Sequence, residues 1–387
     1  MKSNWEIRPL GELVKFSSGG TPSKKNPDYW NGTIPWISAK TMKDERVSTS
    51  DLMITEEGLA SGSKLAPIGS LLLLTRGSGL FNGIPLCIVE KPVAFNQDVK
   101  CIESCTDVSN KFIFYWLKSQ EEYLRAKLEV TGIGAGKFDT KFLQELNVPI
   151  PCKEERDKIV SIAESISKKI IINTKINDNL YDLLQSIYQL QFGITSGNAA
   201  EGILSDICSY TKDRIAVSEL NLGNYYSTEN MLPGKAGFTE ATSLPTTPQT
   251  TRCNAGDVLV SNIRPYFKKI VLCHSEGGCS TDVLCFAPKA PAYSAYLFCT
   301  LYADRFFDFM VAGSKGTKMP RGDKQQIMTY PVYIPTESEL TAFADFATPI
   351  LSQIHGNNEE NAQLEHLRDT LLPKLMSGEI DVSDIDI

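Results

Sequence analysis

The chain has 387 residues, 42% of them hydrophobic and 22% charged, and a formal net charge of −7. This length and composition are those of a globular protein with two or three domains, and they exclude an intrinsically disordered chain. No stretch approaches the roughly 18 apolar residues of a membrane-spanning helix, and the N-terminus carries no apolar run. We therefore expect a cytosolic protein that is not associated with a membrane.

In chain order, the pattern first predicts short strands separated by turn residues, at 13–16, 34–37, 70–75, 84–89 and 99–102. Two helices are expected at 107–119 and 120–128, followed by a glycine-rich loop at 131–137, a short helix and a strand ending at Pro151. A helical pattern without proline then runs from Glu154 to about Phe192. At 1.5 Å per residue it would be roughly 55 Å long, far longer than one globular domain needs.

The second half repeats this order of elements. Strands are predicted around 202–210, 257–262, 269–273 and 283–286, helices at 292–301 and 303–312, a loop at 313–322 and a last helix at 337–377. The repeat has a period near 184 residues, because Val148 to Pro151 and Val332 to Pro335 close the two globular stretches. This period is too long for a solenoid, whose units have roughly 20 to 50 residues, so it indicates a domain duplication.

The apolar positions of the two long helices also correspond at this offset. Ile159, Ile162, Ile166 and Ile170 fall on Phe343, Phe346, Ile350 and Ile354, and Leu180, Leu183, Ile187 and Tyr188 fall on Leu364, Leu367, Leu371 and Leu372. Helices with such stripes need a partner surface, so we expect them to pack on one another, antiparallel, as a coiled coil. The alternative is that each helix packs on its own domain.

The predicted fold is therefore α+β, with two similar mixed α/β domains separated by two long antiparallel helices that form a coiled-coil spacer with a pseudo-twofold repeat. The expected boundaries are 1–151 for the first domain, 152–195 for the first helix, 196–335 for the second domain, 336–378 for the second helix and 379–387 for a tail. Charge is unevenly divided among these parts. Residues 1–150 hold 18 Lys+Arg against 17 Asp+Glu, residues 202–334 hold 13 against 11, and the remaining helical segments hold 8 against 18. Acidity on the helices suits basic protein partners better than phosphates.

Catalytic and metal-binding motifs are absent from the sequence. The ten cysteines are irregularly spaced, many within apolar runs, and with only three histidines they indicate buried reduced thiols rather than a zinc site, so no cofactor is expected. The 132–138 loop is one residue too short for a phosphate loop and follows a helix. Asn26-Pro27-Asp28-Tyr29 lacks the second proline and the preceding strand of the amino-methyltransferase motif. Hydrolase, metalloprotease and nuclease signatures are missing as well, so the sequence indicates a binding protein rather than an enzyme.

Basic, aromatic and small polar residues gather instead in the loops of both halves. Arginine and lysine bind phosphates or read guanine, Asn reads adenine, and glycine permits close backbone approach, so this composition indicates DNA contact. The candidate DNA-binding residues are Ser18, Gly19, Gly20, Thr21, Lys24, Lys25, Trp36, Lys40, Arg76 and Lys137 in the first half, and Asn262, Arg264, Tyr266, Lys268, Lys318 and Arg321 in the second.

Several segments resemble the specificity subunit of type I restriction-modification systems. In the first half they are Trp5, Leu10 to Leu13, Ser18 to Ser23 and Tyr29 to Ile37. In the second half they are Ala255 to Tyr266 and, above all, the C-terminal run from Leu364 to Ile380. The resemblance implies two target recognition domains that each bind one half of a bipartite site in double-stranded DNA, with the helices as spacer. It also implies partner subunits that carry the chemistry: two methyltransferase subunits and, in the full complex, motor-nuclease subunits.

Two other hypotheses remain open. One is a protein scaffold, in which two similar domains bind proteins and a helical rod sets their separation. The other is a subunit of a different methyltransferase-nuclease that uses the same kind of reader. The first long helix ends Gln189-Leu190-Gln191-Phe192-Gly193 where the second has Pro373 to Gly378, so equal docking of partners at both ends does not follow from the repeat.

Overall fold

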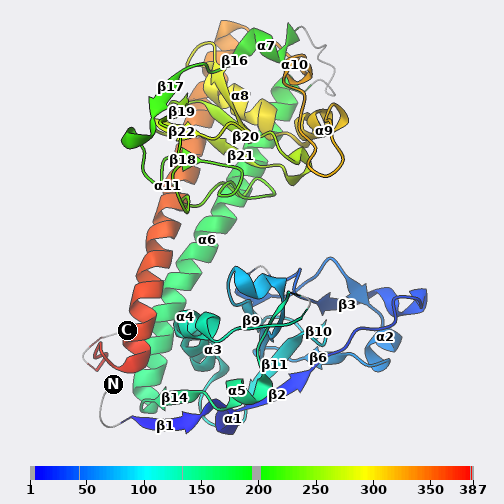
Figure 1. Cartoon of the computed structure of the whole chain (residues 1–387), viewed down its shortest axis with the longest axis vertical. Helices are drawn as coiled ribbons and strands as arrows, with labels where there is room; N and C mark the ends of the chain where they lie inside the picture. Colours follow the sequence, from blue (N-terminus) through cyan, green and yellow to red (C-terminus); the bar gives the residue numbers. More distant parts are fainter. Residues whose placement is uncertain (1–4, 43, 133, 194–201, 384, 386–387) are drawn as a thin grey trace. The chain divides into compact units, whose positions relative to one another are not determined.

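The computed structural model describes residues 5–42, 44–132, 134–193, 202–383 and 385. The chain divides into two compact units, Met1–Ile171 with Asn361–Ile387 and Ile172–Glu360. The division falls inside the two long helices, α6 (Lys153–Phe192) and α11 (Glu337–Ser377), so each unit contains one mixed α/β domain and a part of each helix (Figure 1).

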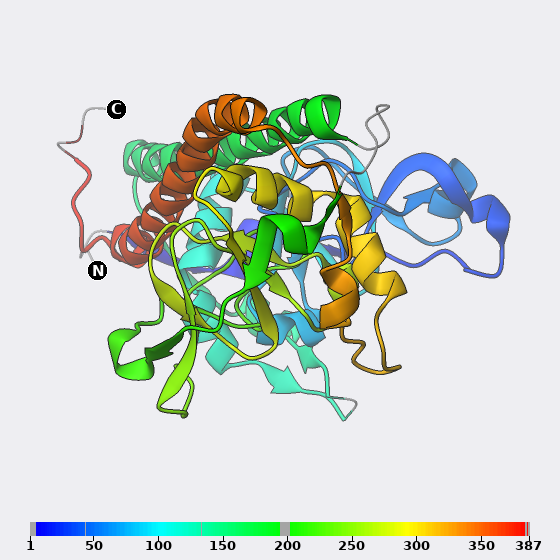
Figure 2. The same cartoon turned by 90° about the horizontal axis from the view of Figure 1, so that it is seen from above.

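The domain of unit 1 is built on a five-stranded sheet of order β2-β11-β7-β9-β4. Its strands are β2 (Val14–Ser18), β4 (Arg46–Val47), β7 (Leu71–Leu74), β9 (Leu86–Val89) and β11 (Val99–Ser104). A second sheet, β5-β3-β10-β6, consists of β3 (Trp30–Ile37), β5 (Met53–Ile54), β6 (Lys64–Ala66) and β10 (Val93–Phe95). The lobe formed by β3, β5 and the short helix α2 (Glu56–Ala60) is the blue part of Figure 2. β7 is buried along its whole length, so its apolar run lies at the centre of the core.

Unit 2 repeats this topology. Its first sheet has the order β16-β23-β20-β21, which matches β2-β11-β7-β9 strand for strand. These strands are β16 (Cys208–Tyr210), β20 (Val258–Ser261), β21 (Ile270–Leu272) and β23 (Val283–Pro288). The second sheet, β17-β19-β22-β18, contains β17 (Arg214–Ala216), β18 (Tyr225–Tyr226), β19 (Gln249–Cys253) and β22 (Gly277–Cys279). Each second sheet has one parallel pair among its antiparallel ones, β3 with β10 and β18 with β22.

Each domain begins and ends at a two-stranded ladder. In unit 1, β1 (Glu6–Pro9) pairs antiparallel with β14 (Asn147–Ile150), and in unit 2, β15 (Gly202–Ile203) pairs with β24 (Pro331–Val332). A one-turn helix follows the first strand in both cases, α1 (Leu10–Leu13) and α7 (Leu204–Ile207). The sequence predicts only strands at 13–16 and 202–210, and these strand-helix-strand openings correct that prediction. The single turn of α1 buries Leu10 and Leu13, which fix it to the core.

The remaining helices also correspond between the units. In unit 1 they are α3 (Asn110–Ser119), α4 (Glu121–Ala126) and α5 (Thr140–Gln144), and in unit 2 they are α8 (Tyr293–Tyr302), α9 (Asp304–Ala312) and α10 (Lys324–Ile327). Each pair of consecutive helices was predicted from the sequence. In unit 2, α8 lies between the first sheet and the long helices (Figures 1 and 2), since Tyr296 contacts Tyr188 and Phe192 of α6.

Within each unit, α6 and α11 run antiparallel and pack on each other as well as on the domain. In unit 1, Ile159 and Ala163 of α6 share a core with Leu372 and Met376 of α11 and with the sheet residues. In unit 2, Asn177 contacts Asn357, and further along α6 Phe192 packs on Phe343. The predicted fold class is confirmed: two similar mixed α/β domains with two long antiparallel helices. Each long helix packs both on the other helix and on an α/β domain. The two predicted alternatives therefore occur together.

No helix among the described residues is long and apolar enough to cross a membrane.

Candidate nucleic-acid interface

In unit 2, three segments meet at the end of the central strand β20. The amide of Asn262 donates to Asp282 O at 2.8 Å, and the amide of Gly322 donates to Asn262 O at 3.2 Å. The amide of Arg264 donates to Pro320 O at 2.8 Å. Isolated bridges join Arg321 to Ile263 and to Lys315. We call this junction the basic corner of unit 2, consisting of 262–264, Lys315 and 320–322; it brings together the predicted residues Asn262, Arg264 and Arg321.

Unit 1 has the same junction at the end of β7. There β8 (Arg76–Gly77) pairs with β13 (Gly136–Lys137), which places Lys137 opposite Arg76. The amide of Phe138 donates to Thr75 O at 2.9 Å, as that of Gly322 does to Asn262 O. A third strand, β12 (Glu129–Val130), pairs with β13 in the position that Lys315 has in unit 2. Lys137 and Arg321 are therefore equivalent residues, and Arg76 with 136–138 forms the basic corner of unit 1.

Both corners are followed by a capped helix that holds them in place. Asp139 accepts a hydrogen bond from the amide of Lys141 and begins α5, while Asp323 accepts from the amides of Gln325 and Gln326 and begins α10. An N-cap carboxylate satisfies amides that the helix cannot pair itself. In unit 2 this carboxylate also binds Lys315 Nζ at 2.6 Å, which lowers the pKa of Asp323 and raises that of Lys315.

The cations of the two corners differ in their partners. Arg321 Nε lies 3.2 Å from Asp282 Oδ1. The residue equivalent to Asp282 in unit 1 is Asp98. Lys268 and Lys235 both bind Asp304, at 2.9 and 2.7 Å, and their hydrogen bonds hold the pKa of that carboxyl below its usual range. Arg76, Lys137 and Lys318 are exposed and have no ion pair with any residue in the described part of the chain. Among the cations in and beside the two corners, these three are the most available to a phosphate.

Two buried polar atoms of the unit 2 corner have no hydrogen-bond partner among the described residues. They are Asn262 Oδ1 and Arg264 Nε, and the Asn262 side chain is 5% exposed. Buried polar groups are nearly always hydrogen-bonded, so orphan atoms indicate a place where a ligand or water completes the network.

The predicted residues of the first loop lie apart from the unit 1 corner along the chain and serve partly as structure. Gly19 and Gly20 pack against backbone, Ser18 Oγ accepts from Lys100 Nζ, and Thr21 Oγ1 donates to Gln97 Oε1 at 2.7 Å. Trp36 is buried, donates its indole N–H to Gly20 O at 3.1 Å and meets Trp30 edge-on at 5.4 Å. It holds the loop from inside, whereas Lys24, Lys25 and Lys40 are exposed on its surface.

Sequence reasoning missed several residues of these sites. Phe81 is exposed beside the unit 1 corner, and Lys235 joins Lys268 on Asp304. Phe267, exposed beside the unit 2 corner, lies within the basic and aromatic run 264–269 and was predicted with it. The sequence held one signal for the position of the corners. Asp98-Val99 and Asp282-Val283 are the same dipeptide at the 184-residue offset, and in each the Val begins a strand, β11 or β23, that pairs with the central strand. Lys235 gives no such signal, since the residue at the same offset in the first half is Asp51.

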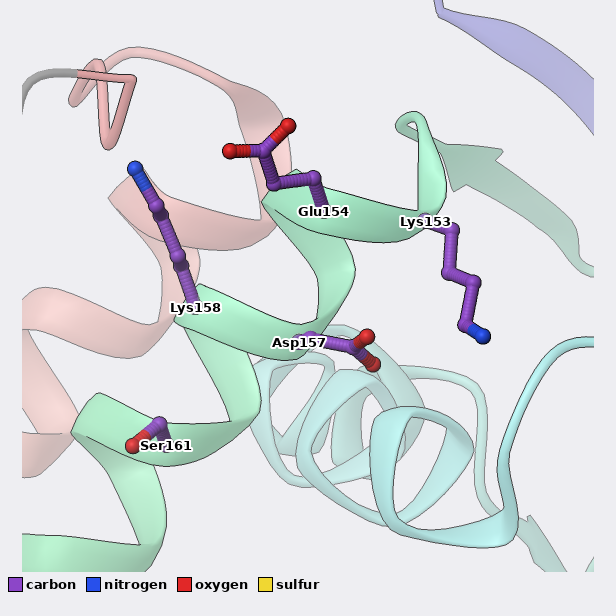
Figure 3. A pocket seen from close by; sticks show the side chains of 5 residues that line it. All are labelled: Lys153, Glu154, Asp157, Lys158 and Ser161. Atoms are coloured by element: carbon purple, nitrogen blue, oxygen red, sulfur yellow. The ribbon is translucent and has the colours of Figure 1, made fainter. Parts of the chain in front are cut away.

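The surface has several hollows. The one that Asp282 lines, of about 350 Å³, adjoins the unit 2 corner. One of about 470 Å³ lies along the first turns of α6, where Lys153, Glu154, Asp157, Lys158 and Ser161 point outward (Figure 3). Its side chains carry both signs of charge, and Lys158 Nζ donates to Ser383 O at 2.7 Å. None of the predicted DNA-binding residues lines it. In the part of the chain that the structure describes, no group of three or more His, Cys, Asp and Glu side chains is arranged to hold a metal ion.

Comparison with known proteins identifies the architecture. Residues 2–181 match the family model of the type I restriction modification DNA specificity domain. A type I restriction enzyme specificity subunit from Escherichia coli is 33% identical over 194 residues, which is 47% of this chain and about half (48%) of the relative's length. The MjaIX specificity subunit from Methanocaldococcus jannaschii is 22% identical over 99% of this chain and 95% of its own.

The fold is similar to that of the crystal structure of a type I restriction-modification S subunit from M. genitalium, with a TM-score of 0.55, 17% identity and coverage of 97% of this chain and 96% of the other. Residues 2–181 thus resemble a DNA specificity domain, and the duplicated α/β domain on paired long helices has the fold of a type I restriction-modification S subunit. Over nearly its whole length, the chain is similar to a type I restriction enzyme specificity subunit.

Proposed function

We propose that each unit reads one half of a bipartite DNA sequence, and that partner subunits then methylate adenine at that site or cleave the DNA. The observation that supports this most directly is the duplicated basic corner. The same strand end, the same backbone hydrogen bonds and a cation at the same position occur in both units, at Lys137 and at Arg321. Two similar readers on one chain suit a site with two separate halves.

The contacts follow from the chemistry of the corner residues. Arginine reads guanine with two hydrogen bonds and Asn reads adenine in the same way, each worth about 1–3 kcal/mol of discrimination. Arg76 and Lys137 in unit 1, and Arg264 and Arg321 in unit 2, supply the cations. Gly19, Gly20, Lys24, Lys25 and Lys40 would follow the phosphate backbone beside the unit 1 corner.

We further propose that this chain carries no catalytic step of its own and that two methyltransferase subunits supply it, joined by motor-nuclease subunits in the full complex. A protein partner is favoured by one face of α6. Four apolar residues there are exposed: Ile172, Ile176, Leu183 and Leu190. Their spacing of four, seven and seven residues places them along one face of the helix. With domain charges of only +1 and +2, the chain alone would bind DNA weakly, since counterion release grows with the number of phosphates neutralised.

Single-molecule methylome sequencing tests the proposal. The chain is expressed with a candidate methyltransferase subunit from its own organism, in a host without other methyltransferases. We expect a two-part adenine motif with a fixed gap that disappears when this chain is omitted. A complex that purifies intact but methylates no motif would refute the proposal and favour the protein scaffold.

Variants of the two corners assign each unit to its half-site. Lys137→Ala should relax or abolish only one half of the motif and Arg321→Gln only the other, each by about 1–3 kcal/mol in specificity at the affected bases. The exposed residues Lys91 and Lys212 lie outside the corners, so Lys91→Ala and Lys212→Ala serve as matched controls that leave both halves unchanged. Equal loss at both halves from one corner variant would contradict the assignment.

A further inference from the structure

Each unit presents an exposed aromatic tip beside its basic corner. In unit 1 the 3₁₀ turn η2 (Ser78–Phe81) directly follows β8, and its last residue, Phe81, is 42% exposed. In unit 2 the turn η5 (Pro265–Phe267) follows the corner in the same way, and Tyr266 and Phe267 are 50% and 39% exposed. Single exposed apolar residues are common on protein surfaces. The same side-chain type at the same place in two divergent domains indicates a role.

Both tips are held firmly by backbone contacts. Phe267 O accepts from the amide of Gly234 at 2.7 Å, and Lys268 O accepts from the amide of Lys235 at 2.9 Å. Arg264 and Lys268, on either side of η5, have left-handed backbones with φ of 51°. Such backbone conformations are unfavourable for residues other than glycine. They persist where the surrounding structure fixes them, often at functional sites. In unit 1, Phe81 O accepts from Arg125 of α4 at 3.3 Å.

The surroundings of the tips favour a nucleic acid over a protein. The ring centroids of Tyr266 and Phe267 lie 4.8 Å apart with the rings inclined at 57°, and both side chains are partly open to solvent. Lys268 and the basic corner adjoin them, as Arg76 adjoins Phe81 along the chain. The centre of a protein interface is depleted of charge, and of lysine in particular. An apolar wedge flanked by cations is instead what proteins insert between base pairs, where it unstacks one step and the cations bind the adjoining phosphates.

We propose that Phe81 and the pair Tyr266–Phe267 are DNA wedges, each entering the duplex at one base step of the half-site that its unit reads. This inference rests on the proposed function. It adds a second source of selectivity, because a step that unstacks easily, such as pyrimidine–purine, is favoured at a position where no side chain reads the base edge.

The test uses the complex of this chain with its methyltransferase and a duplex that carries the motif found by methylome sequencing. 2-Aminopurine replaces one base at a time across each half-site, leaving out the adenines that are methylated. We expect its fluorescence to rise at one step per half-site when the complex binds. Phe81→Ala should abolish the rise in one half-site only, and the double variant Tyr266→Ala/Phe267→Ala in the other, each with about a tenfold loss of affinity, as for removal of one base–aromatic stack.

Two controls replace exposed apolar residues away from the tips, Ile68→Ala in unit 1 and Leu222→Ala in unit 2, which are 66% and 41% exposed in the wild type. Both should behave as wild type. If the tip variants retain the fluorescence change, or if they lose the methyltransferase subunit during purification, the wedge is refuted while the motif still supports the proposed function. If the wild-type complex shows no sequence-specific binding at all, the proposed function itself fails.

Discussion

Two consecutive glycines determine how the first loop of unit 1 lies on its domain. A Cβ atom added to Gly19 would lie 2.0 Å from Phe95 O, and one added to Gly20 would lie 2.0 Å from Gly62 O. No side chain fits at these distances, so the loop can approach the sheet this closely only with glycine at both positions. The sequence suggested close approach to DNA as the reason for these glycines; their contact with DNA remains a prediction, but the neighbouring backbone is sufficient to require them.

We expect Gly19→Ala to destabilise unit 1 by about 2–4 kcal/mol, because the clash is with backbone that has no room to move. Thermal unfolding followed by circular dichroism measures the change. Gly132 is the matched control, since a Cβ there meets no atom within 4 Å, and Gly132→Ala should leave stability almost unchanged. A melting temperature for Gly19→Ala equal to that of the control would show that the loop is not packed as described.

At the scale of elements, the two units fasten their domains to the long helices with different chemistry. In unit 1, Glu164 of α6 is 9% exposed and binds Lys111 at 2.8 Å and Arg46 at 3.2 Å. In unit 2 the contact is aromatic: Tyr181 stacks on Tyr302 at 4.9 Å. Between the helices of unit 2, buried asparagines form a network in which Asn357 Nδ2 donates to Asn177 Oδ1 at 2.7 Å.

This asparagine network should fix the register of the helix pair in unit 2, as buried polar residues do in coiled coils. Asn177→Ala removes the acceptor of Asn357 and also a donor to Asn358 Oδ1 at 2.8 Å. It should cost about 1–3 kcal/mol in unfolding free energy, measured by urea denaturation, because it leaves a buried amide unsatisfied. Asn179, two residues further along α6, is exposed, and Asn179→Ala should be nearly neutral. Equal effects of the two changes would disprove the role of the network.

Glu164 predicts a pH dependence for unit 1. Burial raises the pKa of Glu164, but its hydrogen bond to Lys111 and the nearby cations outweigh burial, so the pKa is lowered overall. The unfolded chain therefore binds this proton more readily, and the stabilisation is present above the ordinary pKa of about 4.3 and is lost as pH falls through the lower folded value. Glu164→Gln should cost about 1–3 kcal/mol at pH 7, and chemical denaturation at several pH values should show the cost shrinking with acidification.

The control for this change is Glu154→Gln, which alters an exposed glutamate on the same helix. It should have little effect on unfolding at any pH. A constant difference between Glu164→Gln and wild type from pH 7 down to strongly acidic conditions would show that the ion pairs contribute nothing.

For the whole molecule, the contrast between ionic and aromatic attachment predicts unequal responses to salt. At about 1 M salt the screening length falls to about 3 Å, so partly exposed ion pairs weaken while aromatic packing does not. We expect hydrogen exchange in α3 of unit 1 to accelerate on going from low to high salt, and exchange in α8 of unit 2 to remain slow. Acceleration of both to the same degree would contradict this difference.

Much of this architecture could be predicted from the sequence. The elements that could not be predicted were hidden for physical reasons. The long helices were clear because a proline-free apolar pattern continues for about forty residues, and α6 and α11 have 40 and 41. Of the second sheets, only the strand at 34–37, part of β3, was predicted, because the other strands are short and resemble turns in sequence. β22 begins Gly277-Gly278, where glycine is needed because a Cβ on Gly277 would lie 2.3 Å from Asn224 O.

The candidate interface was predicted as residue types but not as an arrangement. Arg76 and Lys137 were both named from the sequence, yet their pairing depends on β8 meeting β13, which are far apart in the chain. The glycine-rich 132–138 segment, which is one residue too short for a phosphate loop, contains β13. Long-range pairing of two-residue strands leaves no periodic signal, whereas charge and aromatic content do.

The ladders at the base of the domains have an evolutionary consequence. Because β1 pairs with β14, and β15 with β24, the chain enters and leaves each domain through adjacent strands. A segment whose ends lie side by side can be exchanged for another of the same form while the flanking chain keeps its course. Recombination at one of these two ladders would thus replace one α/β domain and leave the other unchanged. New target sequences would then arise by combining domains rather than by gradual substitution of the loops.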